Sequence, residues 1–533
     1  MRHPGEGVQL EPLRMHARAL AARLGTAAAA ATTVGRERAI LRLFGVAGLD
    51  GAGHPLAARV VDRFLDGHPE RLAGGVALPF GLVMSGSRRT PRDLALEIAA
   101  GTVDLGEEAA ALADPRLRAA AEAEVQRLAR AALDRIDANR TVRRELVDLL
   151  GDPGWPWVGV SLRSPAIVDA LDEAALALDA GAGLLAVGVP PARELAERAA
   201  KRGQEVAGWR PDPASRGGLD TPDPEQPPVP TGSQRALAVL RRSMDELAAR
   251  RRGYARILTD AHPLGAPEQA VVAAFERVDV VVADPIREIA SGRVGPDRAL
   301  ADHAFAHRLL ARAGARVVIP AGPLVVGPDL ATGMPSNGAV RSGRALALQL
   351  LAVELALQAG VADASLVAGA LPDWITDEPG SPARAVAEVA LREALFPGLG
   401  LAFVEPAGGG DDSRESLAVE PGLAWCALVA ALLPHAAGTQ LVLRRAGGPV
   451  GLITAQARAA ADVAAGLRVA LEPGGLTGPA AEHASAVARA ASATLELLDR
   501  DGWGVLFGTS YLPEAAADGV AVRTDGLGLF AAS

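Results

Sequence analysis

Sulfur and lysine are almost absent from this chain of 533 residues. Cys426 is the single cysteine, which excludes disulfide bonds within the chain and metal sites built from several thiolates. Lys201 is the single lysine, although lysine and arginine together number 54. Any step that needs a lysine amine of this chain would depend on Lys201, whose neighbours Arg198 and Arg202 are typical of a charged, solvent-facing helix.

Long apolar runs and an excess of basic charge are also absent. No uncharged apolar run approaches the roughly 20 residues needed to cross a bilayer. Glu6, Glu11 and Arg14 interrupt the first segment, so we expect no signal peptide. The net charge is −9 with acidic and basic residues interspersed, which argues against a nucleic-acid-binding surface. We therefore expect a cytoplasmic protein that binds a small molecule and neither a membrane nor nucleic acid.

The sequence divides into three regions. Residues 1–152 have the apolar spacing of helices, and one of these helices is predicted to begin at Thr90 with Pro91 in its first position. Residues 153–450 alternate short apolar runs with helical segments, and residues 451–533 are predicted to form a C-terminal helical extension. The eight apolar runs are 157–162, 183–189, 255–259, 278–283, 316–320, 364–368, 401–405 and 439–443.

Eight strand–helix units are the number that closes a (β/α)8 TIM-type barrel, so we predict that α/β fold for 153–450. An open doubly wound sheet is the alternative, but it usually has fewer strands and a glycine-rich phosphate loop. No G-x-G-x-x-G follows a strand here, and neither a Walker loop nor a G-x-S-x-G elbow is present. A proline-rich insert, 203–232, follows the second strand and is either a lid or partner-docking loop or an insertion without fixed structure.

The carboxyl ends of barrel strands carry the chemistry, which makes the polar residues there the candidates for a site. The predicted catalytic residues are His262, Asp260 and Asp284, and the predicted cofactor-binding residues are Arg287, Ser164 and Asn337. No metal site is predicted. Further polar residues at strand ends are Arg163, Ser336, Asp373, Trp374, Glu405, Arg444 and Arg445.

Several of these residues have a simpler structural interpretation. His262 could move a proton or cap the helix that begins near Pro267. Arg287 could bind a phosphate or carboxylate, or pair with Asp284 or Glu288 on a helix surface. His303 and His307 are four residues apart on one helix face, a spacing that can bind a metal, but the absence of a third ligand favours two packing or surface histidines.

Several segments carry a resemblance to a known family. They are Thr32–Asp50, Leu78–Leu105, Asn139–Arg143, Tyr254–Asp284 and Phe507–Gly508. In these segments the chain resembles the large (α) subunit of the lysine 5,6-aminomutase family. The resemblance implies a TIM barrel in an isomerase that shifts an amino group of a lysine-like amino acid. It also implies adenosylcobalamin and pyridoxal phosphate as cofactors, and a small cobalamin-binding β subunit that supplies the Schiff-base lysine.

The resemblance weakens at the positions that serve substrate and cofactor in the family. Arg287 stands where the family has an aromatic ring over the pyridoxal, and His262 where it has a serine. The arginine and serine that serve the cofactor in the family are replaced within the loop Val189–Glu194. The position of the family's aspartate near the substrate amine falls near Leu324, and that of its lysine for the substrate carboxylate falls near Ala402. Two functions remain open: a divergent aminomutase α subunit in a hetero-oligomer, or a non-catalytic paralogue that acts as an assembly or regulatory scaffold. An unrelated barrel enzyme using Asp260, His262 and Asp284 as acid and base is a third, weaker alternative.

Overall fold

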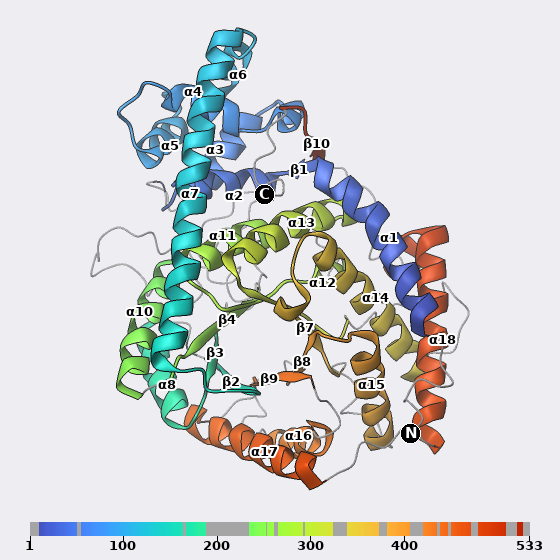
Figure 1. Ribbon diagram of the computed structural model, residues 1–533. Coiled ribbons are helices and arrows are strands. Elements are labelled where there is room, and N and C mark those ends of the chain that lie inside the picture. Colours follow the sequence, from blue (N-terminus) through green and yellow to red (C-terminus); the bar gives the residue numbers. More distant parts are fainter. Residues whose placement is uncertain are drawn as a thin grey trace, which may run out of the picture.

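Eight parallel strands form a closed barrel in the computed structural model of the chain (Figure 1). They pair in chain order, and the pairing of β2 with β9 closes the ring. Every strand overlaps one of the eight predicted segments, so the predicted (β/α)8 barrel is confirmed. The strands are β2 (Trp157–Leu162), β3 (Leu184–Val187), β4 (Arg256–Asp260), β5 (Val280–Val282), β6 (Arg316–Ile319), β7 (Leu366–Gly369), β8 (Gly400–Val404) and β9 (Thr439–Arg444).

The structure describes residues 10–48, 50, 55–162, 164, 167–187, 234–251, 253–260, 265–290, 294–322, 338–371, 381–405, 419–433, 438–445, 449–470, 478–507 and 520–525. Among these residues no helix combines the length and the apolar composition that a membrane span requires.

The interior of the barrel is a packed apolar core that ends in a polar floor. Its residues are Trp157, Leu184, Ala186, Leu258, Val280, Val282, Val318, Val367, Ala402, Leu441 and Leu443. At the amino ends of the strands, the Arg256 guanidinium lies 3.7 Å from the centre of the Trp157 ring and 2.7 Å from an oxygen of Asp152. Arg316 covers the same ring at 4.9 Å. Because these side chains fill the amino ends of the strands, we expect a ligand site at the carboxyl ends.

Helices surround the barrel. They are α8 (Ile167–Asp179), α10 (Gln234–Arg251), α11 (Ala266–Phe275), α12 (Pro285–Ala290), α13 (Pro296–Ala313), α14 (Gly338–Gln358), α15 (Ser381–Leu395), α16 (Val419–Leu432) and α17 (Val450–Ala470), with the 3-10 turn η4 (Asp363–Ser365). Sequence signals set the ends of α13, because Pro296 occupies its first turn and Gly314 terminates it in the left-handed conformation with φ 66°.

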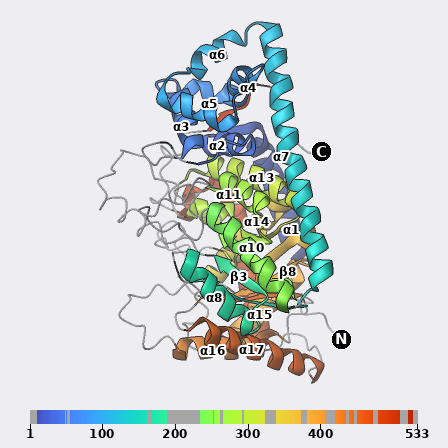
Figure 2. The ribbon, with the colours of Figure 1, turned by 90° about the vertical axis from the view of Figure 1, so that its left-hand side faces the viewer.

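A helical region precedes the barrel and lies at one side of it (Figure 2). It contains α1 (Leu10–Ala30), α2 (Val34–Leu43), α3 (Leu56–Leu65), η1 (Pro69–Gly74), α4 (Ala77–Met84), α5 (Pro91–Ala100), α6 (Leu105–Ala111) and α7 (Pro115–Leu150). The helix predicted at Thr90 is confirmed: Thr90 and Asp93 form a capping box, and Pro91 is the first helical residue. Helix α7 has 36 residues and runs from this region along the barrel (Figures 1 and 2).

The two ends of the described chain meet. The short strand β1 (Ala31–Thr33) pairs antiparallel with β10 (Val520–Val522). Next to this pair, Arg523 contacts Glu37 at 3.3 Å and Asp525 at 2.7 Å. Helix α18 (Gly478–Asp501) packs on α14 and α1, and the short α19 (Gly504–Phe507) follows it.

Candidate functional site

The carboxyl ends of β4 and β5 bring two of the predicted residues together. Asp260 is the last residue of β4, and Asp284 follows β5 at the start of α12. Oδ1 of Asp284 accepts a hydrogen bond of 2.9 Å from the backbone N–H of Ile286, as an N-terminal helix cap does. The other oxygen, Oδ2, is buried and has no hydrogen-bond partner among the described residues. The residue as a whole is 5% exposed. Burial raises the pKa of Asp284 above its ordinary value.

Arg287 reaches back from α12 to β4. Its Nη1 donates a hydrogen bond of 3.1 Å to Oδ2 of Asp260. This contact crosses the barrel rim, and the Arg287 charge also lies close enough to Asp284 to oppose the rise in the pKa of that carboxyl. The side chains of Arg287 and Asp260 are both partly exposed, so the ion pair contributes little to stability and can open for a ligand.

Helix α13 supports the turn that carries Asp284. His303 Nε2 lies 2.9 Å from Oε2 of Glu288 on α12. His307 Nε2 lies 3.1 Å from the carbonyl oxygen of Ala283, the residue before Asp284. Because a carbonyl oxygen only accepts, His307 donates from Nε2. Burial, assisted by His303, lowers the pKa of His307 to about 3, so this ring is neutral.

The two histidines pack against each other and bind different partners on neighbouring segments. Their ring centres are 5.6 Å apart in an edge-to-face arrangement, and each ring uses Nε2 for a different partner. Within the described ranges no three His, Cys, Asp or Glu side chains are grouped as a metal would require. The contact between His303 and Glu288 was not predicted. The signal for it was a polar pair, Asp302 and His303, in a helix that is otherwise mostly Ala, Leu and Arg.

A cavity of about 30 Å³ connects these side chains at the barrel rim. Three carboxylates and one guanidinium line it, so the ionised site carries an excess of negative charge. Its lining residues are Asp260, Gly265, Ala266, Val282, Asp284, Arg287, Glu288 and His303. Such a site suits an ammonium group, which can donate to Asp284 Oδ2, better than it suits an anion.

The other predicted site residues lie elsewhere or outside the described residues. Ser164 donates from Oγ to Asp169 at 3.3 Å and from its backbone N–H to Glu173 at 3.2 Å, so it is engaged with helix α8. His262 and Asn337 lie outside the described residues, as do Arg163, Ser336, Asp373 and Trp374.

The eighth strand ends in a buried ion pair. Arg444 Nε donates to Glu405 Oε2 at 2.8 Å, and Arg444 Nη1 to the Cys426 sulfur at 3.0 Å. The backbone N–H of Arg445 donates to the same glutamate oxygen at 2.8 Å. These groups satisfy one another and form a wall of the barrel rather than a second ligand site.

The described residues that line this cavity do not form a cradle for a phosphate. Arg287 is the one cation that lines the cavity among the described residues, and it is paired with Asp260. A phosphate placed there would meet Asp284 and Glu288, and like charges in a buried site repel strongly. The donor set therefore fits an amine and not the phosphate of pyridoxal phosphate.

The family model and the curated relatives that match the chain belong to the same family. The family described as the D-lysine 5,6-aminomutase TIM-barrel domain of the alpha subunit matches residues 6–210 and 228–408, which is more than half of the chain. The lysine 5,6-aminomutase alpha subunit of Acetoanaerobium sticklandii is 25% identical over 284 residues, covering 53% of this chain and 50% of that protein. That of Fusobacterium nucleatum is 24% identical over 288 residues, with the same coverage. The chain thus spans about half the length of the curated relatives it matches.

Among solved structures, the chain was matched to a dihydropteroate synthase of Yersinia pestis in complex with a sulfonamide drug. It is 14% identical with a TM-score of 0.35, and the match covers 59% of this chain and 93% of that one.

Proposed function

The chain belongs to the family of D-lysine 5,6-aminomutase α-subunit TIM-barrel domains, and we propose that it is the barrel subunit of a divergent aminomutase. In this proposal it pairs with a small cobalamin-binding β subunit and works with adenosylcobalamin and pyridoxal phosphate. The reaction is a 1,2-amino shift on a lysine-like amino acid.

The buried, unpartnered oxygen of Asp284 is the observation that supports a retained ligand site. A buried polar atom without a hydrogen bond costs about 1–3 kcal/mol, and more when it is charged. A chain that served only as a scaffold would gain stability by losing this carboxylate, whereas a substrate ammonium would supply the missing donor. Asp284 is one of the residues that line the small cavity, so a ligand bound there lies next to this carboxylate.

The residues of this chain have separate roles in the proposal. Asp284 binds a substrate ammonium through Oδ2 and orients it. Arg287 can leave Asp260 and bind the substrate carboxylate, and Asp260 then becomes available to a second amine. His307 and His303 hold the turn from β5 to α12, so Asp284 keeps its position when the ligand is absent.

We propose that the cofactors bind to groups other than the described rim residues. The lining of the small cavity does not fit a phosphate, and we derive no step of the reaction through pyridoxal phosphate from it. Lys201, the one lysine of the chain, lies outside the described residues. We infer that the Schiff-base lysine comes from the partner subunit.

The first test is to isolate the protein from its host under dim red light. Co-purifying chains are identified by mass spectrometry, and a visible spectrum reports corrinoid and pyridoxal aldimine. A small cobalamin-binding partner with both chromophores supports the proposal. A lone chain with neither chromophore contradicts it and favours the non-catalytic scaffold.

The second test asks whether the rim recognises an amine. Isothermal titration calorimetry compares lysine with norleucine, which has the same length and lacks the terminal ammonium. We expect lysine to bind about tenfold more tightly, because one charge-assisted hydrogen bond is worth about 1.5–3 kcal/mol. Asp284→Asn should abolish this preference, whereas Asp297→Asn, at the exposed start of α13, should preserve it. Equal binding of the two amino acids to the unmodified protein would refute the assignment.

A further inference from the structure

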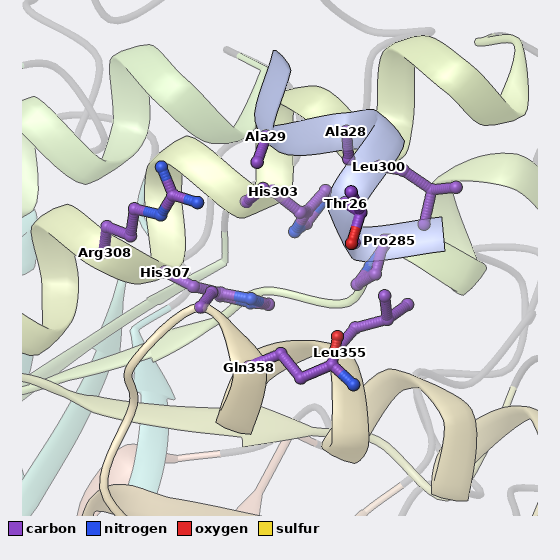
Figure 3. A pocket seen from close by; sticks show the side chains of 13 residues that line it. Thr26, Ala28, Ala29, Pro285, Leu300, His303, His307, Arg308, Leu355 and Gln358 are labelled. Carbon is purple, nitrogen blue, oxygen red and sulfur yellow. The ribbon is translucent and has the colours of Figure 1, made fainter. Parts of the chain in front are cut away.

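A second cavity lies outside the barrel, between α1, α13 and α14. Its volume is about 310 Å³, within the size of sites that hold small molecules. Figure 3 shows side chains from these helices directed toward the same space. Ala28, Ala29, Pro285, Leu300, Ala304 and Leu355 form its apolar walls. Of its lining residues, His303 alone also lines the small cavity at the barrel rim.

Arg308 supplies this cavity with a positive charge. In the part of the chain that the structure describes, its guanidinium forms no hydrogen bond or ion pair, although it is half-buried. It is also close enough to Arg36 to contribute, after burial and Arg523, to lowering the pKa of that residue to about 10. Several buried arginines have carboxylate partners, for example Arg42 with Glu268 at 2.7 Å. An anion in the cavity would supply the missing partner of Arg308.

His303 supplies a hydrogen-bond acceptor. Its Nε2 must donate, because its partner Glu288 offers a carboxylate oxygen. In the neutral ring Nδ1 then carries a lone pair. This atom is buried without a partner among the described residues, and the residue is 3% exposed. A ligand N–H or O–H would satisfy it.

We propose that this cavity binds a small hydroxy acid or amino acid with an aliphatic body. The ligand carboxylate pairs with Arg308, its hydroxyl or ammonium donates to Nδ1 of His303, and its side chain packs on Leu300 and Leu355. An anion alone would leave His303 without a donor, and an alcohol alone would leave Arg308 without a partner.

The ligand is an effector of the barrel rim. His303 contacts it through one nitrogen and Glu288 through the other, so occupancy of the cavity and the position of α12 are linked. By reciprocity, any ligand at the rim that moves Glu288 changes the affinity of the cavity by the same factor.

The test is calorimetric titration of the full chain with 2-hydroxy-4-methylpentanoate. Two analogues each remove one group: 4-methylpentanoate lacks the hydroxyl, and 4-methylpentan-2-ol lacks the carboxylate. We expect the hydroxy acid to bind about tenfold more tightly than either analogue. Arg308→Gln should weaken its binding by about tenfold. Arg312→Gln, on the same helix but paired with Asp137 at 2.6 Å, is the matched control and should bind normally.

Two further outcomes would overturn the proposal. One is no heat of binding at millimolar hydroxy acid, and the other is equal affinity in Arg308→Gln and Arg312→Gln. The assay needs no turnover, so it remains valid if the aminomutase proposal fails.

Discussion

Replacement of Asp302 by asparagine should stabilise the protein at neutral pH and not at acidic pH. Asp302 lies on α13 with 2% of its surface exposed, and it accepts a hydrogen bond from Thr33 Oγ1. Burial raises the pKa of its carboxyl from the ordinary 3.8 to about 6, against the opposing effect of Arg298. The folded state therefore binds a proton more tightly than the unfolded state does, and the charged form destabilises it.

The size of this effect follows from the difference in pKa. About two pKa units correspond to about 3 kcal/mol, which is the full cost of the carboxylate above pH 6. Below pH 3.8 both states are protonated and the cost vanishes; at pH 5 it is about 1.5 kcal/mol. Asparagine has no such titration and keeps an oxygen that can accept from Thr33.

The assay is urea unfolding of the variant and the unmodified protein between pH 5 and 7.5. We expect the stability difference to favour Asp302→Asn and to grow by about 1.5 kcal/mol over this range. Asp297→Asn, in the exposed first turn of the same helix, is the control and should show no growth with pH. A constant difference, or a variant that is less stable at pH 7.5, would refute the assignment of a raised pKa.

Three further outcomes test other parts of the structure. Gly369→Ala should destabilise the barrel by about 2 kcal/mol or more in urea unfolding, because a Cβ would lie 2.4 Å from the backbone nitrogen of Ala321; Gly253→Ala, with open space around it, should not. Glu388→Gln should cost about 3–5 kcal/mol by leaving Arg392 buried without its charge partner, whereas Asp462→Asn, in an exposed pair, should cost less than about 0.5 kcal/mol. Arg287→Gln should tighten binding of pentane-1,5-diamine about threefold or more, measured by calorimetry, because the small cavity loses the guanidinium that lines it beside three carboxylates; unchanged affinity would contradict an acidic amine site.

The strands of the barrel could be predicted because buried parallel strands have a local signature. Runs such as Val280–Val282 are continuously apolar and are separated by helical segments, so each strand–helix unit can be recognised from its own residues. The pairing of β1 with β10 was not predicted. Each of these strands has three residues, and their partners are almost the whole chain apart, so neither contains a pattern that a local reading can detect.

The position of the candidate site could be predicted, but its contacts could not. The barrel rule places Asp260 and Asp284 at strand ends from sequence alone. The partner of Arg287 depends on the register in which Asp260 aligns with Val282, a tertiary fact that decides how far α12 reaches back over β4. The roles of His303 and His307 depend on how α13 packs against the β5–α12 turn, which helical spacing does not specify.

The meeting of β1 and β10 has a consequence for synthesis of the protein on the ribosome. Residues 31–33 emerge before the barrel sequence, whereas their strand partner and the guanidinium of Arg523 that contacts Glu37 emerge after it. Glu37 is 1% exposed in the finished fold. Until the last described residues leave the exit tunnel, the nascent amino-terminal region has an open strand edge and a carboxylate without that partner, so it completes its fold after the barrel sequence has been translated.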